Sequence, residues 1–358
     1  MLGNKVLKGD CKAKCHKSTD NNSFVKTQKH HFMLNGKPLV FNGFNAYWLM
    51  CMASDPSTRA KVTAAFQKSS KIGMNLVRTW AFSDGGNKPL QTSPGIYNTD
   101  MFKGLDFVIS EAKKYGLRLI LSLVNNWDDF RGKKQYVQWA RDRGQYVNSD
   151  DEFFTNVVVK GYYKNHLKDW IVEMAAEIKS IDKNHLLEIG LEGFYGESMP
   201  DKKQNNPGYE VGTDFITNNG VNNVDFATIH LYPDQWVSGA SDEARAKFVE
   251  NWIASHIRDC DSILKKPLLI AEFGKSSWSS GYTVEARDEY FRGIFDMAYE
   301  SARNRGSCSG TTFWQVMAVG MDNWGDGYQV VLDTNPSTTA VIAKQSQRIS
   351  SLSSSLEL

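Results

Sequence analysis

An acidic residue ends one of the most apolar runs of the chain. Glu272 lies in Leu269–Phe273, where an ionised carboxylate is costly unless a cation or a hydrogen-bond donor faces it. Arg78 lies near the end of a second apolar run, Asn75–Phe82, and an arginine beside a carboxylate favours its ionised form. Two interpretations follow: a structural Arg–Glu ion pair, or a carboxylate that is kept ionised for catalysis.

Other apolar runs also end in polar or aromatic residues. His230 and Tyr232 are two residues apart, so they share one face of a strand end; a purely structural histidine is the ordinary alternative. The other residues at run ends are Trp80, Asn125, Asn126, Trp127, Glu192 and Trp314. Catalytic groups of a parallel barrel lie at the C-terminal ends of its strands, so we interpret these residues as one constellation.

The apolar runs alternate with helical patterns, which predicts a parallel sheet with connecting helices. Asp100–Tyr115 has apolar residues at three- and four-residue steps, and Gly116 follows at the C-cap position. Similar helical patterns occupy Ser241–Leu264, Val284–Arg305 and Thr338–Leu352. The runs that predict barrel strands are Val40–Trp48, Asn75–Phe82, Leu117–Trp127, Leu186–Tyr195, Phe226–Tyr232, Pro267–Phe273 and Thr311–Val316.

A (β/α)8 barrel needs eight strands, and this chain offers seven. The runs beginning at Leu117 and Leu186 start 69 residues apart, whereas the other neighbouring starts lie 35 to 44 residues apart. The long interval holds only a polar loop and a helical pattern, Asp151–Ile181. We therefore expect an open or distorted barrel, with Asp151–Ile181 as one long or bent helix across the gap. An open doubly-wound sheet with a long insertion is the alternative.

The remaining segments set the domain boundaries. Phe32–Phe41 predicts a β-hairpin, because Asn35-Gly36 suits a type I′ turn. We expect one barrel domain over 24–352, preceded by a disordered basic tail over 1–23 and followed by a short tail over 353–358.

The composition excludes several classes of protein. The chain has 42 Lys+Arg and 40 Asp+Glu, a net charge of +2, which argues against nucleic-acid binding. No apolar run reaches the ~20 residues that span a bilayer, and the N-terminus lacks the apolar segment of a secretory signal. The five cysteines form no disulfide framework. No complete metal-ligand pattern occurs, so we expect neither a metal nor a cofactor.

From about Phe24 to Leu352, the chain resembles the plant-type endo-β-1,4-mannanases of glycoside hydrolase family 5. The matching stretches are Phe41–Met50, Val77–Phe82, Leu121–Asp128, Leu186–Gly196, Thr228–Pro233, Ala271–Lys275 and Phe313–Gln315. The resemblance implies a (β/α)8 TIM barrel and retaining hydrolysis of internal β-1,4-mannosidic bonds in mannan, glucomannan and galactomannan. It also implies a monomeric extracellular or cell-wall enzyme, although this chain shows no signal peptide.

The resemblance also implies roles for the residues at the strand ends. Glu272 would be the catalytic nucleophile on the seventh strand, Arg78 and Tyr232 would fix its carboxylate, and His230 would belong to the floor of the site.

The tryptophans receive substrate-binding roles from the same resemblance. Trp314 would stack under the sugar at the cleavage subsite, and Trp80 would contact the substrate. Trp127 would be a platform on the leaving-group side.

Half of the catalytic pair is missing from the sequence. Retaining glycosidases use two carboxylates, and the family takes its acid/base glutamate from an Asn-Glu-Pro motif at the end of the fourth strand. The dipeptide Asn-Glu occurs nowhere in this chain. Tyr162–His166 and Asp169–Met174 resemble the start of the third helix and the body of the fourth, so about one β/α unit is absent between them.

Other acids are weaker candidates for the missing role. Glu192 ends the next strand and is the best substitute, although contact with the substrate is its more ordinary role. Glu188 within the strand and Glu197 beyond it are poorer candidates, and Glu173 and Glu177 fall on one face of a helix. We therefore expect a mannanase of impaired or lost activity. The alternative is an inactive splice or pseudogene product that binds mannan weakly.

Overall fold

The computed structural model describes residues 24–125, 127–154, 156, 158–159, 167–209 and 211–355. The predicted tail 1–23 and the last three residues of the predicted tail 353–358 lie outside these ranges. The first three residues of that C-terminal tail instead complete the last helix, α11 (Pro336–Ser355).

The centre of the molecule is a curved parallel sheet in the order β8-β5-β4-β11-β10-β9. The first and last of these strands in the sequence, β4 and β11, pair with each other. Pairing of the first and last strands closes a parallel sheet into a barrel, so the alternative of an open doubly-wound sheet is wrong. The six strands are β4 (Phe41–Asn45), β5 (Leu76–Trp80), β8 (Arg118–Ser122), β9 (Ala227–Leu231), β10 (Leu268–Phe273) and β11 (Cys308–Phe313).

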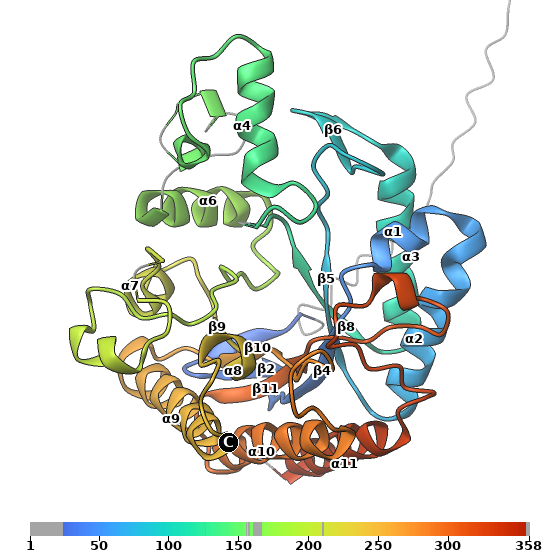
Figure 1. The fold of residues 1–358 in the computed structure, drawn as a ribbon, viewed down its shortest axis with the longest axis vertical. Coiled ribbons are helices and arrows are strands. Elements are labelled where there is room, and N and C mark those ends of the chain that lie inside the picture. Colours follow the sequence, from blue (N-terminus) through green and yellow to red (C-terminus); the bar gives the residue numbers. More distant parts are fainter. Residues whose placement is uncertain are drawn as a thin grey trace, which may run out of the picture.

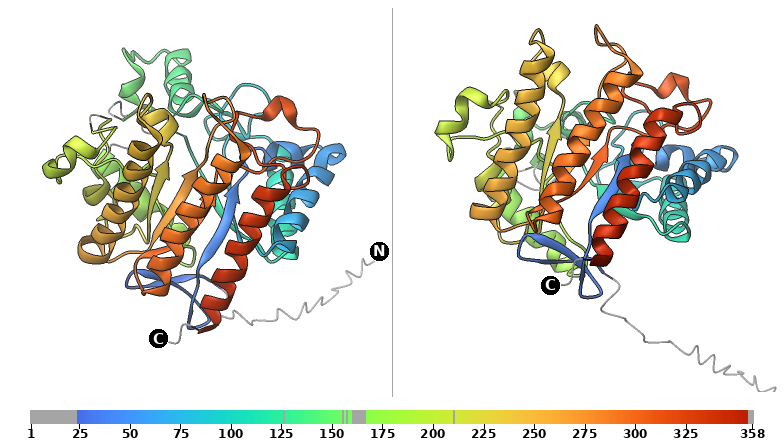
Figure 2. Two further views of the ribbon diagram at one scale, coloured as in Figure 1. Left: turned by 60° about the horizontal axis from the view of Figure 1, so that its bottom comes forward. Right: turned by 90° about the horizontal axis from the view of Figure 1, so that it is seen from below.

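The barrel is open between β8 and β9, which are the two edges of the described sheet. The predicted incomplete barrel is therefore confirmed. Most helices surround the sheet on its outer side, whereas α4 lies apart from the sheet at the top of Figure 1. The helices are α1 (Leu49–Ser54), α2 (Arg59–Lys71), α3 (Thr99–Lys114), α4 (Gly132–Asp142), α6 (Leu167–Ile181), α7 (Phe215–Asn219), α8 (Pro233–Trp236), α9 (Asp242–Asp259), α10 (Val284–Arg303) and α11. Figure 2 shows α9, α10 and α11, in yellow to red, side by side along the outer face of the sheet.

The segment predicted as a strand over Leu186–Tyr195 runs beside β9 without forming a regular strand. Two backbone hydrogen bonds tie it there, from Asp225 N–H to the Leu187 oxygen and from His230 N–H to the Glu192 oxygen, each at 2.8 Å. Gly190 and Gly193 have φ of 65° and 104°, which interrupts an extended path. The strand prediction is wrong because these turns break the ladder and no described strand lies on the other side.

The prediction of one helix over Asp151–Ile181 is also wrong at its start. Asp150–Phe154 form a separate 3₁₀ helix, and Asn156 is not helical. Residues 160–166 lie outside the described ranges, and α6 covers Leu167–Ile181.

Two small hairpins lie outside the main sheet. β1 (Lys26–Gln28), β2 (His31–Leu34) and β3 (Lys37–Pro38) form the predicted N-terminal hairpin with one additional strand. Asn35 and Gly36 both have positive φ, 52° and 78°, as a type I′ turn requires. The second hairpin joins β6 (Gln91–Ser93) to β7 (Ile96–Tyr97).

Aromatic packing holds the strands that carry the site. The rings of Phe273 on β10 and Phe313 on β11 both contact Phe291 on α10, with centroids 5.0 and 5.4 Å away. All three side chains are fully buried. Truncating a buried phenylalanine to alanine typically costs about 3–5 kcal/mol, so this cluster fixes β10 and β11 firmly against the helix layer.

Candidate active site

Glu272 and Arg78 meet at the carboxyl ends of β10 and β5. An Arg78 Nη1 hydrogen bond reaches Glu272 Oε1, and the residues are 7% and 9% exposed, respectively. Asn45, at the end of β4, accepts a second bond from Nη1 at 3.1 Å. Its own amide donates to the Ala271 oxygen at 2.8 Å. Asn45 thus orients the guanidinium between the strands. The sequence reasoning missed this role, because Asn45 lies within the predicted run Val40–Trp48 and ends a strand only in the structure.

The second oxygen of Glu272 faces β9. Tyr232 donates its hydroxyl to Oε2 at 2.8 Å, and His230 Nδ1 lies 3.5 Å from the same oxygen. His230 is the register partner of Glu272 in the β9–β10 pair, which brings both side chains to one level. The structure therefore assembles Arg78, His230 and Tyr232 around one carboxylate.

The ionisation of this cluster follows from burial and charge. Burial opposes ionisation of Glu272, but the influence of His230 and Arg78 and the hydrogen bonds from Tyr232 and Arg78 outweigh it and hold the pKa of this carboxyl below its ordinary value. Burial also lowers the pKa of His230 to about 4, so the imidazole is neutral near neutral pH and Arg78 is the cation there. The site holds one ionised, oriented carboxylate, the state that a nucleophile needs.

An aromatic wall stands beside Glu272. The Trp314 ring lies 5.4 Å from that of Trp80 and stacks with Tyr47 at 6.0 Å and 11°. Trp314 Nε1 donates to Asp326 at 2.5 Å, and the Arg78 guanidinium lies 5.4 Å from the Trp80 ring. The sequence reasoning did not single out Tyr47 or Asp326, and nothing in their local sequence marks them as neighbours of Trp314.

Glu192 is a second carboxyl coupled to Glu272. Burial and the negative charge of Glu272 raise the pKa of Glu192 to about 7, against the opposing effect of the nearby Trp127 side chain. Trp127 itself is 66% exposed. Two carboxyls whose environments push their pKa values apart are typical of an acid and a nucleophile that work together.

Glu188 serves the fold. It accepts hydrogen bonds from the Gly190 N–H and, at 3.3 Å, from Thr228, so it stabilises the irregular segment.

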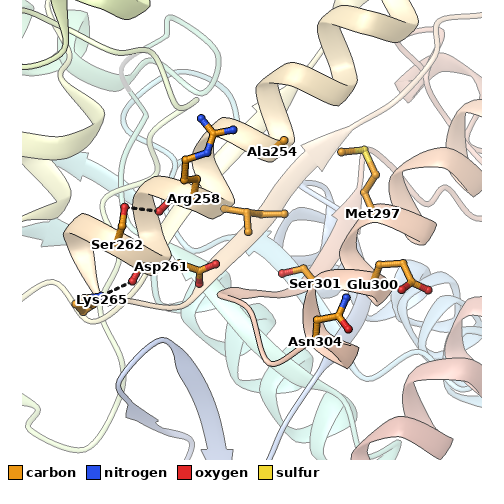
Figure 3. Close-up of a pocket in the computed structure, with 10 residues that line it drawn as sticks. Ala254, Arg258, Asp261, Ser262, Lys265, Met297, Glu300, Ser301 and Asn304 are labelled. Carbon is orange, nitrogen blue, oxygen red and sulfur yellow. Dashed lines mark hydrogen bonds between the residues drawn. The ribbon is translucent and has the colours of Figure 1, made fainter.

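A groove of ≈ 630 Å³ between α9 and α10 (Figure 3) lies on the outer side of the helices. Its Asp261 accepts the Ser307 N–H at 2.7 Å, and its Lys265 donates to the Asp261 backbone oxygen at 2.6 Å, so these polar groups serve the fold.

Two further observations concern the described residues alone. They contain no group of three or more His, Cys, Asp or Glu side chains placed to hold a metal ion. None of their helices is long and apolar enough to cross a membrane.

Known proteins resemble this chain over most of its length. A family model described as glycoside hydrolase family 5 beta-mannosidase-like matches residues 22–165 and 158–353. Putative mannan endo-1,4-beta-mannosidase 9 of Oryza sativa subsp. japonica is 54% identical over 372 positions, covering 93% of this chain and 91% of the relative. Mannan endo-1,4-beta-mannosidase 4 of Solanum lycopersicum is also 54% identical, covering 93% of each chain.

Solved structures share the fold. A glycoside hydrolase family 5 mannosidase from Rhizomucor miehei superposes with a TM-score of 0.78 at 19% identity, covering 94% of this chain and 100% of the other. The endo-beta-1,4-mannanase from Thermotoga petrophila gives a TM-score of 0.72 at 26% identity, covering 88% of this chain and 78% of the other.

The alignment with the rice relative has more positions than the number of residues that this chain contributes to it. Because 93% of 358 residues is about 333, about 39 of the 372 aligned positions have no residue in this chain. The two stretches of the family match meet at residues 158–165, within the long interval between the predicted third and next strands.

Proposed function

Because the chain belongs to glycoside hydrolase family 5 and to its endo-β-1,4-mannanases, we propose that Glu272 is its nucleophile and that hydrolysis of mannan is impaired by loss of the acid/base residue. The observation that carries the first part is the enclosure of the buried Glu272 carboxylate by Arg78, Tyr232 and His230. In a retaining mechanism, this carboxylate attacks the anomeric carbon and displaces the glycosidic oxygen of the leaving sugar, and water later hydrolyses the resulting glycosyl-enzyme ester.

Three observations support the loss of a strand-bearing segment. The sheet is open between β8 and β9, the family match breaks at residues 158–165, and about 39 aligned positions are missing. A single β/α unit at this place would supply the fourth strand. Without its glutamate, the leaving oxygen lacks its usual proton donor, and loss of general acid catalysis costs ~10²–10⁴-fold in rate.

Glu192 is the substitute donor that the geometry favours among the described carboxyls. It lies beside β9 at the level of His230, and its pKa of about 7 keeps much of it protonated at neutral pH. If Glu192 donates the proton, residual activity falls as the pH rises through about 7, and Glu192→Gln abolishes that activity. If Glu192 only contacts the substrate, Glu192→Gln leaves the pH profile unchanged.

The substrate side of the proposal rests on the aromatic residues. Trp314 and Trp80 form a wall beside Glu272, and Trp127 offers an exposed ring at the opening. Flat aromatic faces suit an uncharged sugar chain. We assign β-1,4-mannan in the plant cell wall as the polymer, with the protein acting as a monomer.

A comparison of two substrates tests the mechanism. An aryl β-mannoside with a strongly acidic leaving group needs no proton donor, whereas galactomannan does. We expect the protein to cleave the aryl substrate and to release reducing ends from galactomannan at least ~10²-fold more slowly than an intact relative. Glu272→Gln, which retains hydrogen-bonding groups toward Arg78 and Tyr232, should cleave neither.

Each outcome has a definite meaning. Galactomannan hydrolysis as fast as that of the intact tomato relative would refute impairment. Cleavage of the aryl substrate by Glu272→Gln would refute the nucleophile. If the parent cleaves neither substrate, the second candidate holds: an inactive mannan-binding protein, which the open sheet favours. Retention in a galactomannan gel, reduced by Trp314→Ala, then checks that binding.

A further inference from the structure

Trp278 is an exposed tryptophan beside the site that neither the mechanism nor the sequence reasoning uses. It lies in the loop after β10, six residues beyond Glu272, and it is 74% exposed. Among the tryptophans whose side chains the structure describes, only Trp127, at 66%, is comparably open. A single exposed apolar residue is ordinary on a protein surface. A binding role for Trp278 therefore requires that its loop hold the ring at the site.

One short turn connects Trp278 to the catalytic cluster. Asp326 accepts the Trp314 indole N–H, and the Trp278 ring packs on the next residue, Gly327, where a Cβ would lie 2.9 Å from ring atom Cδ2. The following residue, Tyr328, has its ring 5.3 Å from that of Tyr232, which bonds Glu272. Three consecutive residues thus touch the cleavage-site tryptophan, the exposed tryptophan and the tyrosine that bonds the nucleophile.

Hydrogen bonds hold residues 276–278 of the loop in place. Ser277 N–H donates to the Gly327 oxygen at 2.7 Å, and Trp278 N–H donates to Ser276 Oγ at 3.1 Å. Asp234 Oδ2 accepts both the Ser276 N–H at 3.2 Å and the Tyr328 hydroxyl at 2.9 Å. The backbone at Trp278 is therefore fixed before any ligand binds, which reduces the conformational entropy lost on binding.

We infer that Trp278 is an additional carbohydrate platform, which stacks on a pyranose ring of a β-1,4-mannan chain beyond the unit bound at Trp314. The inference rests on the proposed mannan substrate. Trp127 follows β8 and Trp278 follows β10, with β5, β4 and β11 between these strands in the sheet. The two exposed indoles therefore flank the wall of Trp80 and Trp314, and a long chain can engage both.

Binding of oligosaccharides of two lengths tests this role. The experiment uses Glu272→Gln protein, so that no ligand is consumed, and measures mannohexaose and mannotriose by calorimetry. We expect Trp278→Ala to weaken mannohexaose binding about tenfold, the loss of one aromatic contact of ~1.4 kcal/mol. Mannotriose, which the central tryptophans can hold alone, should bind within twofold of the parent. Trp278→Phe keeps a flat ring and should recover most of the mannohexaose affinity.

The control variant is Tyr146→Ala, because Tyr146 is 84% exposed in the connection after α4 and lies outside the described site. It should not change either affinity. If Trp278→Ala binds mannohexaose as the parent does, or loses affinity for both sugars equally, the platform is refuted while mannan binding stands. If the parent protein binds neither sugar nor galactomannan, the proposed function fails and the platform fails with it.

Discussion

The Trp127 side chain lies close enough to Glu192 to lower the pKa of that carboxyl, although the two residues come from opposite sides of the open sheet. Trp127 follows edge strand β8, and the Glu192 backbone oxygen accepts a hydrogen bond from His230 on edge strand β9. The contact therefore spans the opening at the catalytic end of the strands. It involves Glu192, whose pKa is raised by burial and by the charge of Glu272.

Replacing Glu192 should change how stability depends on pH. Burial and Glu272 raise its pKa from 4.5 to about 7, so between these values the folded protein holds a proton that the unfolded chain has released. Stability therefore falls as the pH rises through this window and remains reduced above it. Glu192→Gln cannot ionise, so its melting temperature should exceed that of the parent at pH 8 and approach it at pH 4. The exposed Glu289→Gln on α10 should follow the parent at both values.

Removing the cation beside the nucleophile should destabilise the fold. Arg78→Met leaves Glu272 buried without its charge partner, and breaking a buried ion pair costs about 3–5 kcal/mol. Urea unfolding should show this loss at pH 7, with part of it recovered in the double variant Arg78→Met/Glu272→Gln. Lys247→Met, which breaks an exposed pair with Glu250, should change the free energy of unfolding by less than about 1 kcal/mol. Equal effects of the two single variants would contradict the buried-pair interpretation.

Two glycines provide a matched test of strand packing. A Cβ at Gly43 on β4 would lie 2.1 Å from the Leu76 oxygen on β5, so Gly43→Ala must push these strands apart and should cost about 1–3 kcal/mol. Gly293 lies within α10 with nothing within 4 Å of such a Cβ, so Gly293→Ala should stabilise the protein by about 0.5–1 kcal/mol. Thermal unfolding of both variants measures the contrast; destabilisation by Gly293→Ala would contradict it.

The open side of the barrel should be visible in amide hydrogen exchange. Every residue of β8 is partly exposed, whereas β4 and β11, in the middle of the sheet, are buried throughout. Edge amides open more readily than central ones. Peptides that cover Arg118–Ser122 should therefore exchange faster than those that cover Cys308–Phe313. Equal protection would mean that the edge at β8 is covered in solution.

Much of the fold follows from local patterns. The turn at Asn35-Gly36, the helix end at Gly116 with φ of 71°, directly after the C-cap Tyr115, and most barrel strands are where the sequence predicts them, because turn chemistry and apolar runs act over a few residues. The boundaries are less accurate: β11 begins at Cys308, three residues before the predicted start. Ser309 and Gly310 are polar or small, yet they are buried in the parallel sheet, so their side chains give no apolar signal.

Two of the wrong predictions concern segments in or next to the interval that lacks a strand. Leu186–Tyr195 has the composition of a buried strand, but a regular ladder needs neighbours, and its glycines turn where only β9 offers partners. Asp151–Ile181 has a helical pattern, but its beginning forms a separate 3₁₀ turn whose Asp150 pairs with Arg141 of α4. Tertiary contacts override local propensity in both segments.

The sequence by itself determined the family, the strand ends and the residue types at them, because side-chain alternation and motif composition are written along the chain. Only the tertiary structure decided which of those side chains meet. Asn45 and Arg78 are 33 residues apart, and Arg78 and Glu272 are 194 apart, yet the barrel brings them within hydrogen-bonding distance. The opposing pKa shifts of Glu192 and Glu272 arise in the same way, since burial and the distance between charges exist only after the strands have packed.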